Sequence, residues 1–443
     1  MTTSRARRRS RASRRRNARR RRARSCRRAS TRPTRTSRGS RPSRSSCSSR
    51  SRSRWRTGCS RRPSRRSARR SSSATASASP PSTPSDRIES VNRFLNLARR
   101  VARGRPPVGS TPADVVHREN KWRLLRYRSE AVVHETPVLL VPSLINRHYV
   151  LDLLPGKSFV EHLVGQGFDV FCIDWGTPAD EDRYLTFDDI ADRYIGRAIR
   201  VASSFGARGK AHVLGYCMGG TLATVHAAAH PERLASLMAL AAPIRFDDDG
   251  LLSRWVRSPG FDVDALVDGF GNVPWPLMQA SFHMLRPTLS LWKAVKLIDK
   301  AWDDRFLDGF FATETWGNDN VSFPGECYRT YIRELYREDR LIRGEMSLSG
   351  RRVYLEDITC PVLSITFEHD NIVPHASASA LTERVSSEDR EHLHLPGGHV
   401  GAVVSSAAKK ELWPLMCDFW ASRDAAPVGS QARSKKRRAA VSH

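Results

Sequence analysis

The first 85 residues contain no lysine, no aspartate and no glutamate, although they hold about 30 arginines. The whole chain has 443 residues and a formal net charge of +30, so this segment accounts for nearly all of the excess charge. Serine, alanine, threonine and proline make up most of the remainder, and a segment with so few apolar residues cannot offset its ordering entropy. We therefore expect residues 1–85 to be disordered and the rest to be a nearly neutral globular chain.

Three interpretations of this extension compete. An arginine-rich arm can bind nucleic acid or another polyanion through phosphate contacts. A targeting segment is the second, but a signal peptide needs an apolar stretch of about 7–15 residues, and the extension has none. The third is a misplaced start codon, which the composition favours because GC-rich DNA translated out of frame gives such a sequence. We therefore expect no nucleic-acid partner, and residues 425–443 are interpreted as a solvated basic tail.

Long apolar runs and closely paired cysteines are also missing. No run reaches about 18 apolar residues, so we expect no membrane span. The eight cysteines show no CxxC spacing. This pattern predicts neither a metal site nor a disulfide framework, and it favours a reducing compartment.

From about Asp86 onward, short apolar runs alternate with helical patterns. This alternation predicts an α/β protein with a mostly parallel sheet covered on both faces. We assign residues 86–245 and 353–424 to the two parts of this core. The expected strands are TPVLLVP (136–142), FDVFCIDW (168–175), AHVLG (211–215), LASLMALAAP (234–243) and CPVLSITFEHD (360–370).

Between residues 246 and 352 the strand signal disappears, and tryptophans punctuate a largely helical stretch. We expect a helical cap inserted into the core and folded over the sheet. An aromatic-rich helical segment of this kind equally fits an ordinary part of the core.

The stretch LGYCMGGTLA (214–223) has the form of a nucleophile elbow, in which a strand, a tight turn and a helix present a catalytic side chain. The usual serine is replaced by Cys217. The minimal side chains of Gly215, Gly219 and Gly220 allow close passage of neighbouring chain, and the N-terminus of a helix opening at Met218 would stabilise a thiolate. The alternative is a buried structural cysteine beside a glycine-rich turn.

A nucleophile of this kind needs a base and an orienting acid, which follow in the order nucleophile, acid, histidine in α/β-hydrolases. Asp370 ends a predicted strand, and His399 follows the next strand-like run. Both would reach the same sheet edge as Cys217, so we predict a Cys217, His399 and Asp370 triad. The rivals, which fit this order and context less well, are His148, His230, His369, His375 and His394 for the base and Glu368 for the acid.

The oxyanion hole requires two backbone N–H groups. We assign one to Met218, directly after the nucleophile. The other is assigned to Leu144, in the turn PSLIN (142–146) that follows a predicted strand.

These motifs together resemble the polyhydroxyalkanoate synthases, and most closely the catalytic subunits of the short, two-subunit classes. The resemblance rests on GYCMGG (215–220), VPSLINRHYVLDL (141–153), FDVFCIDWG (168–176), FGNVP (270–274) and the closing Asp370 and His399, and it covers about residues 86–424. It implies an α/β-hydrolase fold, with Cys217 as nucleophile, His399 as base and Asp370 as the acid that helps to activate the substrate hydroxyl. One departure is Asn371, where the family commonly has histidine.

The resemblance further implies an acyltransferase that polymerises (R)-3-hydroxyacyl-CoA into polyester and releases CoA, without a cofactor or a catalytic metal. The expected partners are the acyl-CoA, the growing chain, a second copy in a homodimer, a second synthase subunit and the surface of cytoplasmic polyester granules. Two alternatives stay open. A thioesterase or depolymerase would use the same triad, and a polyanion-binding protein with a degenerate hydrolase domain would use none.

Overall fold

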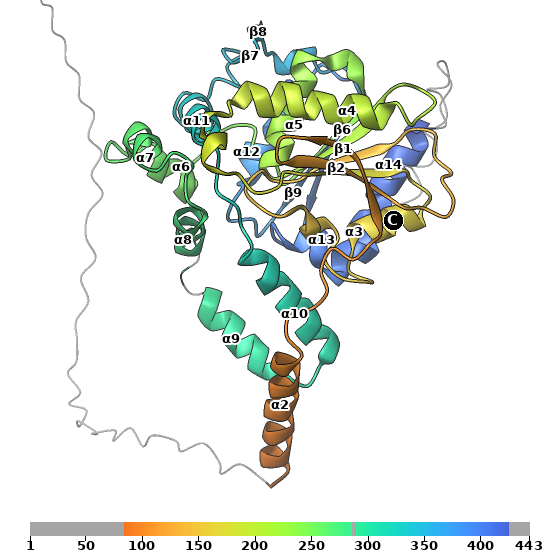
Figure 1. Cartoon of the computed structure of the whole chain (residues 1–443), viewed down its shortest axis with the longest axis vertical. Helices are drawn as coiled ribbons and strands as arrows, with labels where there is room; N and C mark the ends of the chain where they lie inside the picture. The colour runs from red at the N-terminus through yellow and green to blue at the C-terminus, as the bar shows by residue number, and fades with distance from the viewer. Residues whose placement is uncertain (1–83, 286, 288, 425–443) are drawn as a thin grey trace, which may run out of the picture. The chain divides into compact units, whose positions relative to one another are not determined.

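The described chain is organised around a mostly parallel sheet (Figure 1). The computed structural model describes residues 84–424 apart from residues 286 and 288. Within them, eight strands pair in the order β1-β2-β4-β3-β5-β6-β9-β10. β2 is antiparallel to both β1 and β4, and every other neighbouring pair is parallel. The strands are β1(Ala113–Glu119), β2(Trp122–Tyr127), β3(Val138–Val141), β4(Val170–Asp174), β5(Ala211–Tyr216), β6(Leu234–Leu240), β9(Val362–Phe367) and β10(Arg390–Leu395).

The five strands expected from apolar runs are confirmed as β3, β4, β5, β6 and β9. Every residue of β3, β5 and β9 is buried. Parallel strands covered on both faces need apolar side chains on both, and this explains why they appear in the sequence as continuous apolar runs. The α/β class with a mostly parallel sheet is therefore also confirmed.

Helices cover both faces of this sheet. Side chains of α4, α5 and α12 pack with one set of strand side chains, which includes Leu139 and Val141. Side chains of α3, α13 and α14 pack with the other set, which includes Val138 and Leu140. Figure 1 accordingly shows α4 and α5 on one side of the strands and α3, α13 and α14 on the other. These helices are α3(Phe159–Gly165), α4(Ile195–Ser203), α5(Met218–Ala229), α12(His375–Arg384), α13(Gly401–Val404) and α14(Trp413–Asp424).

The sequence did not predict the β1–β2 hairpin. β1 mixes charged and apolar residues and is only partly buried, because it lies at one edge of the sheet. Asn120 adopts a φ of 51° at the turn between the two strands, a conformation that asparagine tolerates better than most residues. The hairpin makes the sheet mixed rather than wholly parallel.

The stretch between β6 and β9 is largely helical, as expected, but it ends in a short ribbon that the sequence did not predict. Ser349 and Gly350 both have positive φ in the turn of this ribbon, and strands of two residues leave no periodic pattern. The elements are α6(Leu251–Val256), α7(Val263–Phe270), α8(Trp275–Leu285), α9(Leu289–Asp299), α10(Asp304–Gly317), α11(Gly325–Thr330), the π-helical η5(Tyr331–Arg337), β7(Ser347–Leu348) and β8(Arg351–Arg352). The domain boundaries given above stay predictions.

The predicted extension over residues 1–85 lies outside the described residues except for Pro84 and Ser85, where α2(Pro84–Ala102) begins. The predicted basic tail, residues 425–443, lies wholly outside them. Near the end of α2, Arg100 donates to the carboxylate of Asp308 on α10 at 2.6 Å. This buried arginine ties α2 to the helical stretch.

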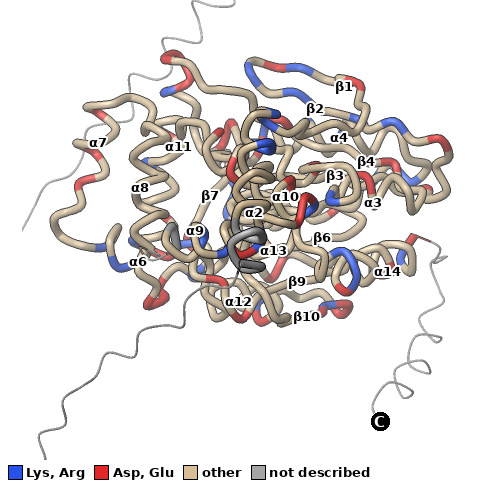
Figure 2. The backbone as a smooth tube through the Cα atoms, turned by 90° about the horizontal axis from the view of Figure 1, so that it is seen from below, with Lys and Arg blue, Asp and Glu red and all other residues tan. Residues whose placement is uncertain are grey.

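Asp, Glu, Lys and Arg are interspersed along most of the described chain, whereas α8 contains none of these four residue types (Figure 2). Large apolar side chains on α8 and α9 are exposed; they are Trp275, Leu277, Met284, Leu291, Trp292, Val295 and Ile298. None of the helices in the described part of the chain has the length and apolar character needed to cross a bilayer.

Candidate active site

Cys217 occupies a strained turn between the end of β5 at Tyr216 and the start of α5 at Met218. Its φ is 57° and its ψ is −132°, a conformation that L-residues seldom adopt and that concentrates at functional sites. The Cys217 N–H donates to the carbonyl of Leu240 at 3.0 Å, and its carbonyl accepts from Gly220 N–H at 2.8 Å. The turn thus has the form of a nucleophile elbow.

Three glycines around Cys217 are required by close backbone contacts. A Cβ on Gly215 would lie 2.3 Å from the Cα of Gly220, and one on Gly220 would lie 2.3 Å from the Cβ of Ala242. A Cβ on Gly219 would lie 2.1 Å from the carbonyl oxygen of Val141. These distances are far below van der Waals contact, so the first turn of α5 can pack against β3 and β5 only with glycine at these positions.

His399 and Asp370 are held together at the carboxyl ends of the neighbouring parallel strands β10 and β9. His399 Nδ1 lies 2.7 Å from Asp370 Oδ2. The other carboxylate oxygen, Oδ1, accepts hydrogen bonds from the N–H groups of Ile372 and Val373, both at 2.9 Å. Because Nδ1 is engaged by Asp370, Nε2 is the ring nitrogen left for Cys217.

The electrostatic environment of His399 couples it to both other residues. Burial favours the neutral imidazole, but the charge of Cys217 and hydrogen bonds to Asp370 and Cys217 outweigh it and raise the pKa of His399 to about 10. The side chains of His399 and Asp370 are 8% and 2% exposed, whereas Cys217 is only half-buried. The structure therefore brings the three predicted residues into one contact, with the thiol on the more accessible side.

The predicted oxyanion residues lie on either side of the elbow. Met218 begins α5, and Leu144 lies in the turn after β3. The indole Nε1 of Trp175 donates to the Pro142 carbonyl at 3.0 Å and so fixes the start of that turn. Gly219 packs directly against the backbone of Val141 and Pro142, which places the turn beside the helix N-terminus. The two N–H assignments stay predictions.

The rival residues have other partners or positions. His148 Nδ1 lies 3.3 Å from Asp174, and His230 Nε2 lies 2.7 Å from Asp192. His369 and Glu368 are exposed. His375 and His394 both contact Thr366 Oγ1. His399 is thus the histidine paired with the predicted acid.

Asn371 stands where the polyhydroxyalkanoate synthases commonly have histidine, and its side chain makes no hydrogen bond to a triad side chain in the described structure. It is exposed, and its side-chain amide donates to the carbonyl of His369 at 2.9 Å. The Asp370 carboxylate is held by backbone N–H groups further along the same loop. The hydrogen bonds that hold the Asp370 carboxylate therefore do not involve the Asn371 side chain.

Two tyrosines of η5 near Cys217 were not foreseen. Burial raises the pKa of Tyr331 and that of Tyr336, and the charge of Cys217 contributes to both shifts. Both rings belong to the apolar cluster against which Cys217 packs. Nothing in the run YRTYIRELY marks it as part of a site, because its proximity to Cys217 depends on how the helical stretch folds back.

Tyr216 is a third unforeseen neighbour of the site. Its hydroxyl donates to the His399 carbonyl at 3.2 Å, and its ring centroid lies 5.3 Å from that of His399.

Within the described residues, two groups of side chains could hold a metal ion, and neither contains a triad residue. The fold and this geometry define an α/β-hydrolase with cysteine at the position of the nucleophile.

Comparison with known proteins identifies the family. A family model described as "alpha/beta hydrolase fold" matches residues 136–404. Another, described as "Poly-beta-hydroxybutyrate polymerase (PhaC) N-terminus", matches residues 101–163. The poly(3-hydroxyalkanoate) polymerase subunit PhaC of Haloferax mediterranei is 36% identical over 345 residues, which cover 77% of this chain and 68% of that protein.

The same polymerase subunit of Allochromatium vinosum is 37% identical over 313 residues, covering 70% of this chain and 88% of that one. The polymerase subunit of Cupriavidus necator is 31% identical over 320 residues, which cover 69% of this chain and 53% of that protein. The chain belongs to the poly(3-hydroxyalkanoate) polymerase family, an acyltransferase family. Its match spans most of the Allochromatium protein but about half of the Cupriavidus protein, which agrees with a resemblance to the short classes.

Proposed function

We propose that this chain polymerises (R)-3-hydroxyacyl-CoA into polyester and that Cys217 carries the acyl group between steps. The observation that supports this most strongly is the contact of a half-buried cysteine on a strained turn with the buried His399–Asp370 pair. A thiol suits the chemistry because transfer from CoA to Cys217 exchanges one thioester for another. The acyl group therefore stays activated, whereas transfer to serine would give a less reactive oxygen ester.

The first step is acylation of Cys217. The raised pKa of His399 supports this residue as the group that accepts the proton of the Cys217 thiol. The thiolate sulfur attacks the carbonyl carbon of the acyl-CoA, and the carbon–sulfur bond to CoA breaks. CoA leaves as a thiol after accepting the proton from His399 Nε2. The products are acyl-Cys217 and a neutral imidazole.

The second step is elongation. Acylation removes the negative charge of Cys217, which is the strongest influence raising the pKa of His399. The neutral imidazole can now accept the proton of the 3-hydroxyl group on an incoming hydroxyacyl-CoA. The hydroxyl oxygen bonds to the acyl carbon, the bond to Cys217 breaks, and the thiolate–imidazolium pair is restored. The chain, one unit longer and attached to CoA, returns to Cys217 by repeating the first step.

The two predicted N–H groups support both steps, and Asp370 acts mainly in the second. Asp370 orients the imidazole through its contact with Nδ1. Its negative charge also helps His399 to remove the proton from the substrate hydroxyl. The N–H groups of Met218 and Leu144 would stabilise the negative charge on the carbonyl oxygen during each attack. No step in this scheme needs a cofactor or a metal ion.

Hydrolysis is the competing function, because water could attack acyl-Cys217 in place of a hydroxyacyl unit. The burial of Tyr331 and Tyr336 against the cysteine favours polymerisation, since apolar surroundings keep water away from the thioester. A thioesterase would need an open path for water to the same carbon.

The partners follow from the same proposal. The substrate and the growing polyester occupy the site, and the protein acts in the cytoplasm at the surface of polyester granules. The exposed apolar side chains of α8 and α9 support contact with another apolar surface, which would be a second copy, a second synthase subunit or the granule.

A single assay tests the reaction. The purified full chain is incubated with 3-hydroxybutyryl-CoA, with and without a candidate second subunit, while released CoA and both products are measured. CoA release accompanied by insoluble polyester supports the proposal. CoA release with only free 3-hydroxybutyrate would establish the thioesterase instead. The Cys217→Ala variant is the control, because any CoA that it releases does not come from attack by Cys217.

A further inference from the structure

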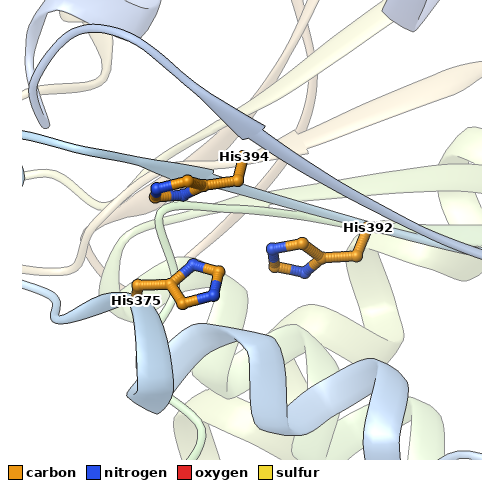
Figure 3. Close-up of side chains that lie close together, drawn as sticks. All are labelled: His375, His392 and His394. Atoms are coloured by element: carbon orange, nitrogen blue, oxygen red, sulfur yellow. The ribbon is translucent and has the colours of Figure 1, made fainter.

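Three histidines gather at the edge of the sheet formed by β10, away from the triad contacts. His392 and His394 are two residues apart on β10, so their side chains lie on the same face of the strand. His375 is the first residue of α12. Figure 3 shows the three rings pointing toward one another between the strand and the helix. One ring nitrogen from each lies within 4.8 Å of the other two.

All three imidazoles contact one hydroxyl group. Thr366 Oγ1, opposite His394 in the β9–β10 register, lies 3.0 Å from His375 Nδ1, 3.0 Å from His392 Nε2 and 2.9 Å from His394 Nδ1. The Leu393 carbonyl is a fourth neighbour of the same oxygen, at 3.3 Å. A hydroxyl has one proton to donate and two acceptor sites. It can therefore bond at most three of these four neighbours at once, accepting from two imidazole N–H groups and donating to one acceptor.

A metal ion would satisfy the three nitrogens together. Imidazole nitrogen is a preferred ligand of Zn²⁺ and of similar transition-metal ions, and three histidines with one open position form a common tetrahedral set. Zn–N distances of about 2.0–2.1 Å require nitrogens about 3.3 Å apart. His375 and His394 are exposed, so their rings can rotate to close that distance and the fourth position can take water.

We propose that His375, His392 and His394 bind one divalent transition-metal ion, with Zn²⁺ as the probe. The site goes beyond the polymerase reaction and takes no part in it. Its ligands join α12, which follows the Asp370 loop, to β10, which precedes the His399 loop. A bound ion would brace these two segments and stabilise the folded chain, because it binds the folded state better than the unfolded one. We expected no metal site from the cysteine spacing, and this proposal departs from that expectation.

The second group that could hold an ion is Asp192, His226 and His230. Its members already have separate partners, since His230 Nε2 pairs with Asp192 Oδ1 at 2.7 Å and His226 Nδ1 contacts the Ala191 carbonyl at 2.9 Å. Both of its histidines are buried and Asp192 is only partly exposed, so this group is less accessible to an ion than the β10 edge. We therefore place the ion at the β10 edge.

The test measures Zn²⁺ binding to the untagged full chain by equilibrium dialysis and the melting temperature with and without ZnCl₂. His375→Gln and His394→Gln alter exposed side chains, so at least one of them is expected to fold. Each should weaken the β10-edge site by about tenfold or more and reduce the rise in melting temperature. His283→Gln, at an exposed histidine of α8, is the matched control and should behave like the wild type. Zn²⁺ bound weakly elsewhere in the chain would be the same in the wild type and in all variants.

Unchanged Zn²⁺ binding in both His375→Gln and His394→Gln would overturn the proposal. The same follows if the wild type binds no more Zn²⁺ than these variants. A loss of binding in His230→Gln alone would assign the ion to the second group and would equally reject the β10-edge site. None of these outcomes depends on whether the chain makes polyester, so failure here is distinct from failure of the proposed reaction.

Discussion

The strands that position the triad and the helices α8 and α9 use their apolar residues in opposite ways. Every side chain of β5 and β9 is buried between helices on both faces of the sheet. On α9, by contrast, Leu291 is 71% exposed and Ile298 is 64% exposed. The reaction site is therefore built on a core that buries its own apolar side chains, whereas the helical stretch presents an apolar surface suited to contact with another molecule. Changes in the two regions should therefore have very different effects.

The largest expected effect is at the nucleophile. Cys217→Ala should lower polymer formation by about 10⁴-fold or more, because it removes the covalent intermediate. Cys217→Ser should leave at most weak hydrolysis, since an oxygen ester holds the acyl group less activated. Initial rates of CoA release and polymer yield measure both variants. Polymerisation at the wild-type rate by either one would remove Cys217 from the mechanism.

The next largest effects are expected at His399 and Asp370, and they distinguish the roles of these two residues. His399→Gln should lower both acylation and elongation by about 10²–10⁴-fold, because the same nitrogen transfers the proton in each step. Asp370→Asn should still acylate but elongate slowly, because the acid acts mainly on the substrate hydroxyl. Trapping with radiolabelled acyl-CoA distinguishes the steps. An unlabelled Asp370→Asn enzyme would show that the aspartate is needed from the first step.

A smaller effect concerns stability in the core. Gly219→Ala places a Cβ 2.1 Å from the Val141 carbonyl oxygen, and such overpacking should reduce the free energy of unfolding by about 1–3 kcal/mol. Gly269→Ala is the matched control in α7, where a Cβ meets nothing within 4 Å. It should stabilise the chain by about 0.5–1 kcal/mol through helix propensity. Urea unfolding measures the free energy of unfolding of both variants. Equal changes in the two would show that the backbone around Gly219 is not tightly packed.

The smallest effect is expected on the helical surface. Trp292 is 56% exposed, so Trp292→Ser should change the free energy of unfolding of the isolated chain by no more than about 0.5 kcal/mol. Trp413, buried on α14 with its Nε1 donating to the Ala402 carbonyl at 3.1 Å, is the comparison. Trp413→Ala should cost about 3–5 kcal/mol. Similar losses in the two variants would show that α9 is packed as tightly as the core.

The core elements could be predicted from the sequence because their signals are local. Continuous apolar runs marked the five inner strands, and the spacing of Cys217, Asp370 and His399 along the chain matched an order set by the fold. The strand ends then fix where such residues meet. That Ile372 and Val373 hold the Asp370 carboxylate could not be predicted, since it depends on the exact path of one loop.

Other features escaped prediction because they depend on packing between distant segments. Tyr331 and Tyr336 reach Cys217 only through the fold of the helical stretch. The edge strand β1 carries too many charged residues to give an apolar signal. The three histidines at the β10 edge come together because β10 lies beside β9 and α12 packs against both.

The most direct test of the thioester mechanism is to find the acyl group on the enzyme. The full chain is mixed with radiolabelled 3-hydroxybutyryl-CoA, quenched in acid within a turnover and digested, and the labelled peptide is identified by mass spectrometry. The mechanism predicts label on the peptide that contains Cys217, released by neutral hydroxylamine as expected for a thioester. Label on a serine peptide, or polymer formed without any label at Cys217, would contradict it.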